Sequence, residues 1–197
     1  MKTNRKIHQV VEDVLTKYQK RGGNFKLFND IFLGENIKYK EVKSRNPNFV
    51  GALTEGINGQ KYIVVNANID NVGRKNFTIA HELGHYFLKH QLKENYNYCS
   101  IKDIREEGNY INNIIEREAN YFASCFLMPE EMLKKDFKSI YFKVTKDTVK
   151  DLIIISNNSY KNWIAIRDNL IKCYGVSEAA LRYRLQNLGL VKFEFEE

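Results

Sequence analysis

The chain has 197 residues, of which 43% are hydrophobic and 13% aromatic, and its formal net charge is +7 at pH 7. This allows one folded domain, with or without an appendage, and enough apolar side chains for a core. No apolar run approaches the roughly 18 residues of a membrane span, and residues 7–13 are too mixed for a signal-peptide core. Three widely spaced cysteines are typical of reduced thiols. We therefore expect a cytoplasmic protein with no membrane partner.

The first part of the chain predicts two helices followed by a small sheet. Apolar residues at helical spacing favour a helix over residues 5–20, and residues 24–36 favour a shorter one. Asn58 and Gly59 are a strong hairpin signal between two strand-like runs. Three runs rich in β-branched and aromatic residues predict the strands: residues 37–42, 49–53 and 61–66.

Residues 81–85 read HELGH, and this is the most specific motif of the chain. Residues four apart share one face of a helix, so His81 and His85 can direct two imidazoles at one metal ion. Glu82 lies beside them and can take a proton from a nucleophilic water. Two nitrogen ligands and a carboxylate base form the arrangement of zinc peptidases. Gly84 inside the predicted helix indicates a packing or access requirement.

A catalytic zinc needs a third protein ligand and one open position. Residues 114–128 predict a second helix that ends before Pro129. This helix offers Glu116 and Glu118, which lie about 200° apart around its axis, so both cannot face one metal. Spacing alone does not choose between them. Asn120, one turn after Glu116, could orient a ligating imidazole through a hydrogen bond.

The other histidines are weaker ligand candidates. The extended metzincin motif requires a histidine where this chain has Gln91 and a glycine where it has Leu88, which excludes that class. We interpret His90 as a solvated or capping residue near a helix end, and His8 has no companion. The polar residues 91–109 predict a loop or a short helix at the rim of the site.

Together these motifs resemble the ImmA/IrrE family of metallopeptidases, which are small cytosolic zinc peptidases of bacteria and phages. The resemblance rests on residues 78–85 (TIAHELGH), on the pattern E-x-x-A-N-x-F-A at residues 116–123, and on residues 127–129 (LMP). It implies Zn²⁺ as the cofactor and a zincin-like HExxH helix. It also implies that Glu116, the glutamate four residues before the asparagine, is the third zinc ligand.

The predicted elements describe an α+β fold, in which a small antiparallel sheet of about three strands packs on helices. We expect a zincin-like metallopeptidase domain over residues 1–135 and a helical region over residues 136–197 that packs on it. Within residues 163–190, the pattern reads as a helix, a turn at Gly175, and a second helix with Ser177 as its N-cap. This is the outline of a helix-turn-helix.

Arg182 and Arg184 lie on the second helix of this hairpin and could read DNA. The alternative is an αα-hairpin that packs beside the peptidase and leaves both arginines solvated. We favour this alternative, because such outlines are common in helical proteins. The net charge is compatible with DNA, with an acidic protein partner, or with neither.

The sequence thus predicts a zinc metalloendopeptidase with Glu82 as the general base. By resemblance, its substrate is a cytosolic helix-turn-helix repressor of a mobile element or stress regulon, and cleavage relieves repression. The alternative is a non-proteolytic regulator that binds a repressor or DNA through its C-terminal helical region. The transition state also needs an oxyanion donor. Four tyrosines are candidates, and the sequence does not choose among them: Tyr86, Tyr98, Tyr110 and Tyr121.

Overall fold

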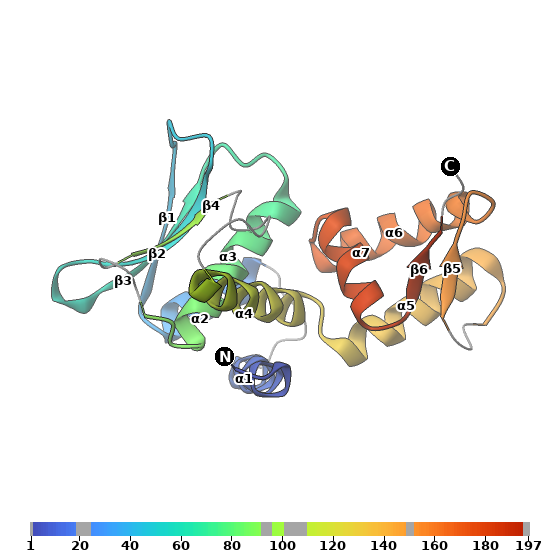
Figure 1. The fold of residues 1–197 in the computed structure, drawn as a ribbon, viewed down its shortest axis with the longest axis horizontal. Coiled ribbons are helices and arrows are strands. Elements are labelled where there is room, and N and C mark those ends of the chain that lie inside the picture. The colour runs from blue at the N-terminus through green and yellow to red at the C-terminus, as the bar shows by residue number, and fades with distance from the viewer. Residues whose placement is uncertain (1, 19–24, 92–95, 101–109, 149–151, 195–197) are drawn as a thin grey trace.

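The computed structural model describes residues 2–18, 25–91, 96–100, 110–148 and 152–194. Its elements form two groups in Figure 1. Helices α1 to α4 accompany the larger sheet, and α5 to α7 accompany a small two-stranded sheet. The α+β fold class predicted from the sequence is confirmed.

The two helices predicted at the start of the chain are present. In α1 (Asn4–Lys17) the side chain of Thr3 caps the first turn by accepting a hydrogen bond from the backbone N–H of Lys6. The apolar stripe of α1 is buried, and α2 is the shorter helix Phe25–Gly34. Residues of both helices belong to the main hydrophobic cluster, so they cover part of the core.

The main sheet has four strands in the order β1-β3-β2-β4. The three predicted runs are all strands, and Asn58 and Gly59 in the β2–β3 connection have φ of 66° and 73°, as Asn-Gly turns favour. The fourth strand comes from the segment that we expected to be a loop or short helix. The strand bounds are β1 (Ile37–Val42), β2 (Phe49–Glu55), β3 (Lys61–Asn66) and β4 (Tyr96–Ser100).

The expectation of a purely antiparallel sheet is wrong for β1, which pairs with β3 in parallel. The chain reverses direction between β1 and β2 and again between β2 and β3, so β3 runs in the direction of β1. β3 then lies between the other two strands and pairs with both. This central position buries Ile63 and Val65 fully.

The two helices that carry the motifs pack against each other. Asn71 is the N-cap of α3 (Val72–Phe87), and its side chain accepts a hydrogen bond from the backbone N–H of Arg74. The second helix, α4 (Tyr110–Leu127), ends two residues before Pro129. A Cβ at Gly84 would lie 3.1 Å from the Cα and the carbonyl oxygen of Ala119. The glycine in the predicted metal helix therefore has a packing reason, because it allows the two helices to approach closely.

The C-terminal residues form the predicted hairpin together with elements that the sequence did not reveal. Gly175 ends its first helix with φ of 60°, and Ser177 caps the second by accepting from the N–H of Ala180. A pair of parallel strands joins the hairpin. The expected boundary at residues 135/136 lies inside α5, and the division into two regions remains a prediction. The bounds are α5 (Glu130–Thr145), β5 (Ile153–Ile155), α6 (Tyr160–Tyr174), α7 (Glu178–Asn187) and β6 (Val191–Phe193).

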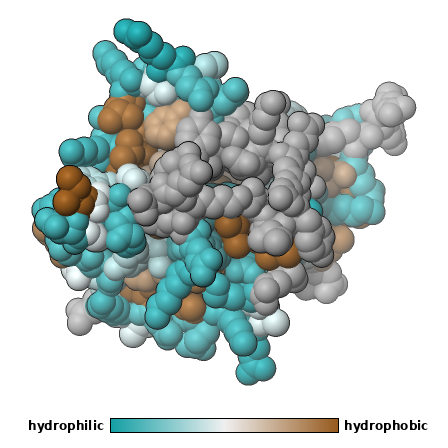
Figure 2. Space-filling model, turned by 60° about the vertical axis from the view of Figure 1, so that its left-hand side comes forward, coloured by the Kyte–Doolittle hydropathy of each residue, from teal (hydrophilic) through white to brown (hydrophobic). Residues whose placement is uncertain are grey.

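Exposed hydrophobic side chains are scattered. Among the coloured residues of Figure 2, hydrophobic side chains form small groups within a largely hydrophilic surface. Leu33 and Ile57 are the most exposed of the large ones, which is ordinary for a folded surface. Within the described ranges, no helix combines the length and the apolar character that crossing a membrane requires.

Candidate metal centre

Helices α3 and α4 bring three potential metal ligands together. The ligand atoms of His81, His85 and Glu116 all lie within 4.8 Å of one another. The two Nε2 atoms are 3.0 Å apart, and the Glu116 carboxylate lies 3.0 Å from Nε2 of His81 and 3.5 Å from Nε2 of His85. The structure thus gathers the three residues expected as ligands, two from one helix and one from the other.

The chemistry and geometry of this cluster suit a zinc ion. Two imidazole nitrogens and one carboxylate are the donor set of open, catalytic zinc sites. At zinc–ligand distances of about 2.0–2.2 Å, tetrahedral ligand atoms lie roughly 3.3–3.6 Å apart. The observed separations of 3.0 to 3.5 Å are close to that spacing. The three residues fit the metal, and three protein ligands leave one coordination position for water or substrate.

The electrostatics of the ligands favour metal binding. Burial would raise the pKa of Glu116, but its hydrogen bonds with His81 and His85 outweigh burial and hold that pKa well below its usual range. Burial lowers the pKa of His85 to about 4. Glu116 is therefore an anion and His85 a neutral imidazole near pH 7, and these are the forms that bind metals.

Glu82 is fully buried beside the cluster. Its carboxylate oxygens have no side-chain hydrogen-bond partner among the described residues, and the backbone of Leu53 on β2 lies close enough to favour the ionised form. Burial raises the pKa of Glu82 to about 8, against the effect of His81, and Glu116 adds to the rise. A cation at the ligand cluster would stabilise the carboxylate and lower this pKa. Burying a carboxyl group that has no side-chain hydrogen-bond partner is costly, and a cation at the neighbouring cluster would offset part of that cost.

Strand β2 passes directly over Glu82. A Cβ at Gly51 would lie 3.3 Å from Oε1 of Glu82 and 2.5 Å from Cγ2 of Thr78. Only a glycine leaves enough room for the strand to lie this close to α3. The sheet therefore forms one wall of the site, and Gly51 is a contributor that the sequence analysis did not single out.

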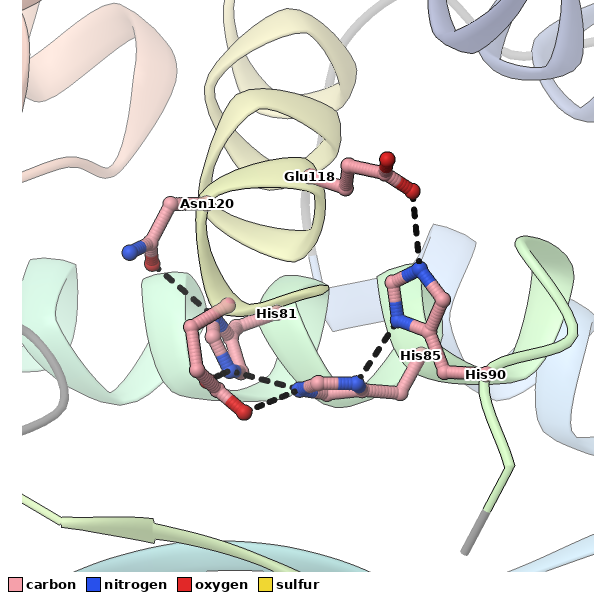
Figure 3. Close-up of polar contacts among 6 residues, drawn as sticks. His81, His85, His90, Glu118 and Asn120 are labelled. Carbon is pink, nitrogen blue, oxygen red and sulfur yellow. Dashed lines mark hydrogen bonds and ion pairs between the residues drawn. The ribbon is translucent and has the colours of Figure 1, made fainter. Parts of the chain in front are cut away.

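Asn120 contacts a ligand, as the spacing suggested. Its Oδ1 lies 2.9 Å from Nδ1 of His81, and Figure 3 shows this contact on the side of the ring away from Nε2. An imidazole that binds metal through Nε2 carries its proton on Nδ1, which then donates to the amide oxygen. The contact orients the ring of His81.

The interpretation of His90 as a solvated or capping residue is wrong. His90 is buried, and its Nδ1 lies 2.9 Å from Nδ1 of His85. Its Nε2 lies 3.2 Å from Oε2 of Glu118, and Figure 3 shows these three side chains in a row. Glu118, the competing ligand candidate, contacts His90 on the side away from the cluster.

Two of the four tyrosine candidates can be placed. The hydroxyl of Tyr86 donates to Oε2 of Glu35, and Tyr121 is half-buried against the core. Neither contact joins the ligand cluster. The side chains of Tyr98 and Tyr110 lie outside the described residues.

The arginines of the hairpin have different environments. Arg184 is buried, and its Nε donates to the backbone oxygen of Met128 over 3.2 Å. The expectation that both arginines are solvated is therefore wrong for Arg184, and its side chain does not face solvent where a nucleic acid would bind. Arg182 is partly exposed, with its guanidinium 4.0 Å from the centre of the Phe193 ring.

Comparison with known proteins agrees with this geometry. A Mycobacterium tuberculosis transcriptional regulator of known structure superposes with a TM-score of 0.56 at 14% identity, over 92% of this chain and 46% of that chain. This likeness shows the fold alone, and the present chain spans about half of that chain's length. No curated protein sequence matches. The model of peptidase family M78, described as the IrrE N-terminal-like domain, matches residues 33–186. The chain therefore belongs to the M78 peptidase family, which confirms the resemblance to ImmA/IrrE proteins.

Proposed function

We propose that this protein is a zinc-dependent endopeptidase that cleaves a specific protein. The observation that carries the proposal is the convergence of His81, His85 and Glu116 beside the buried carboxyl group of Glu82. Family membership supports peptidase chemistry. A purely structural metal site would not need a buried carboxyl group with no side-chain hydrogen-bond partner next to it.

The chain's own groups have distinct tasks in this proposal. His81, His85 and Glu116 hold the ion, and a bound zinc supplies Lewis acidity toward the scissile carbonyl and toward water. Glu82 accepts a proton from the attacking water and returns it to the leaving nitrogen. Strand β2 and α3 enclose Glu82, which limits its access to bulk solvent and strengthens electrostatic interactions in the site.

For the substrate we propose a helix-turn-helix repressor, so that cleavage relieves repression. The support is the resemblance to ImmA/IrrE proteins, together with the family match. The structural neighbour is named a transcriptional regulator, which agrees with a regulatory setting for this fold. The burial of Arg184 favours a protein partner over DNA, because it removes one of the two arginines that a DNA-reading helix would use.

The test measures zinc content and cleavage on the same preparations. We expect about one zinc per chain in the wild type and in Glu131→Ala, whose side chain is exposed at the surface, and none in Glu116→Ala. Each protein is then incubated with a lysate of cells that lack it, and new protein N-termini are identified by mass spectrometry. Termini that require both the wild type and zinc support the proposal. A zinc-loaded wild type that generates none, with purified helix-turn-helix repressors from the same cells also left intact, would refute it.

A further inference from the structure

A turn at the end of α3 places His90 against the second metal ligand. Leu88 ends the helix, Lys89 has φ of 55°, and the N–H of His90 donates to the backbone oxygen of His85 over 3.1 Å. This is a Schellman turn with lysine in the position that glycine usually occupies. It folds the chain back so that the imidazole of His90 lies beside the imidazole of His85.

The hydrogen bonds that link His85, His90 and Glu118 all have the same donor-to-acceptor direction, away from the ligand cluster. Nε2 of His85 faces the ligand cluster, so a metal there requires the proton on Nδ1. That proton can be donated to Nδ1 of His90 over 2.9 Å. The proton of His90 is then on Nε2, from which it is donated to Oε2 of Glu118 over 3.2 Å. Each donor in the row meets one acceptor.

Lys2, in the segment before α1, contacts Glu118 at the end of this hydrogen-bonded row. The backbone N–H of Lys2 donates to Oε1 of Glu118, and Nζ of Lys2 lies 3.6 Å from Oε2. Glu118, His90 and His85 are all buried, so water competes little for these contacts. The two ligating imidazoles are thus held differently. His81 donates to a neutral amide, whereas His85 is linked through a second imidazole to a carboxylate.

We propose that His90 and Glu118 are positioning residues that fix the ring orientation and tautomer of His85 for metal binding. The inference rests on the proposed metal centre. Neither residue lies in the ligand triangle, and they act through His85. A carboxylate that acts on a ligating histidine raises the basicity of that ligand and its affinity for the metal. Here an intervening histidine extends that reach to a carboxylate on α4, anchored by the segment before α1.

The test compares zinc affinity, measured by competition with a chromogenic chelator, in wild type and variants. We expect His90→Ala to weaken zinc binding about 10–100-fold, the range for losses of this kind. His90→Asn keeps an acceptor near the position of Nδ1 and should recover much of the affinity. Glu118→Gln keeps an acceptor but loses the charge, so it should weaken binding less than His90→Ala. His8→Ala, which removes an imidazole from α1, should bind zinc as the wild type does.

Two further measurements separate positioning from folding. The zinc-free proteins are unfolded thermally to compare their stabilities, and the visible d–d bands of the cobalt(II)-substituted proteins report ligand geometry. Altered cobalt bands in His90→Ala, but not in His8→Ala, support the proposal. Wild-type zinc affinity within about twofold in His90→Ala overturns it and leaves the proposed peptidase intact. If His90→Ala does not fold, wild-type zinc affinity together with wild-type cobalt bands in Glu118→Gln, which the proposal expects to bind zinc more weakly, overturns it. Absence of zinc binding by the wild type overturns both proposals.

Discussion

The proposed function gives the residues of the site separable tasks, and substitution of Glu82 tests one of them without removing a candidate ligand. Its carboxyl group is buried next to the ligands and is not one of them. In Glu82→Gln the amide cannot accept a proton, so we expect cleavage of an identified substrate to fall about 10²–10⁴-fold. Zinc content should remain at the wild-type level. If Glu82→Gln cleaves the substrate as fast as the wild type, Glu82 is not the general base. If Glu82→Gln relieves repression fully without cleaving the repressor, the protein is a regulator that acts by binding alone.

Metal removal provides a second prediction at this scale. A ligand that binds only the folded state at 100 times its Kd stabilises that state by about 2.7 kcal/mol. For a domain of this size, that corresponds to a Tm higher by roughly 5–10 °C. Calorimetry should therefore show that a chelator lowers the Tm of the wild type by roughly 5–10 °C when the starting free zinc concentration is about 100 times Kd. His81→Ala should show no chelator-dependent change, and an equal change in that variant would place the stabilising metal elsewhere.

The sequence was informative about residues whose roles follow from helix periodicity. Spacing brought His81 and His85 to one face of a helix, and the structure has them there. Spacing could not choose between Glu116 and Glu118, because the choice depends on how α4 is rotated against α3. It also gave no indication that His90 contacts His85. The turn that returns His90 to His85 carries Lys89 at positive φ, without the glycine that normally marks such a turn.

At the scale of elements, the α3–α4 contact sets the distance between the ligands. In Gly84→Ala the added methyl group would press on the backbone of Ala119, three residues after Glu116. Better helix propensity stabilises by about 1 kcal/mol, and overpacking costs about 1–3 kcal/mol. We expect the free energy of unfolding of the zinc-free protein to fall by no more than about 2 kcal/mol. Zinc affinity should fall at least about tenfold, because α4 is displaced from α3.

The control for this prediction is Gly56→Ala, where the added methyl group would lie 2.9 Å from the ring of Tyr62 and 3.7 Å from the backbone oxygen of Gln60, both far from the α3–α4 contact. This variant changes the β2–β3 connection and should leave zinc affinity unchanged. If Gly84→Ala also binds zinc with wild-type affinity, the ligand geometry does not depend on the close approach of the two helices.

Local patterns predicted the elements better than their arrangement. All three predicted strands were found, because β-branched runs and an Asn-Gly turn are local signals. The insertion of β3 between β1 and β2 was not predicted, since it depends on which strand is buried most deeply in the assembled sheet. β4 was missed because it lies within a polar, charged segment, although its two tyrosines favour a strand, and pairing with β2 provides its backbone hydrogen bonds.

At the scale of the whole molecule, the C-terminal hairpin is attached to both helices that carry the candidate metal ligands. A Cβ at Gly73 in α3 would overlap the backbone of Val176, and Nδ2 of Asn76 donates to the oxygen of Gly175 over 2.8 Å. Arg184 of α7 bonds to the end of α4. Sequence spacing could not reveal these contacts, because the partners are 56 to 103 residues apart. The hairpin therefore constrains the two helices whose separation sets the spacing of the candidate metal ligands.

Arg184 provides the test of this attachment. It is buried at the C-terminal end of α4, where free carbonyl groups and the helix dipole favour a cation. Its Nη2 has no hydrogen-bond partner among the described residues, so part of the cost of burying its charge is not offset. Arg184→Ala should lower the free energy of unfolding by about 3–5 kcal/mol, since it leaves a cavity and removes the donor to Met128.

An apolar side chain of similar length at position 184 shows whether the volume of the arginine side chain or its positive charge stabilises the fold. Arg184→Met fills most of the volume and removes the buried charge, so we expect it to cost less than about 2 kcal/mol. Arg182→Ala is the exposed control and should cost less than about 1 kcal/mol. Urea unfolding gives all three values. If Arg184→Ala unfolds at the wild-type urea midpoint, the guanidinium group contributes nothing, and the contacts of Gly73 and Asn76 alone attach the hairpin to α3. If Arg184→Met loses as much as Arg184→Ala, the charge at the end of α4 is what stabilises the attachment.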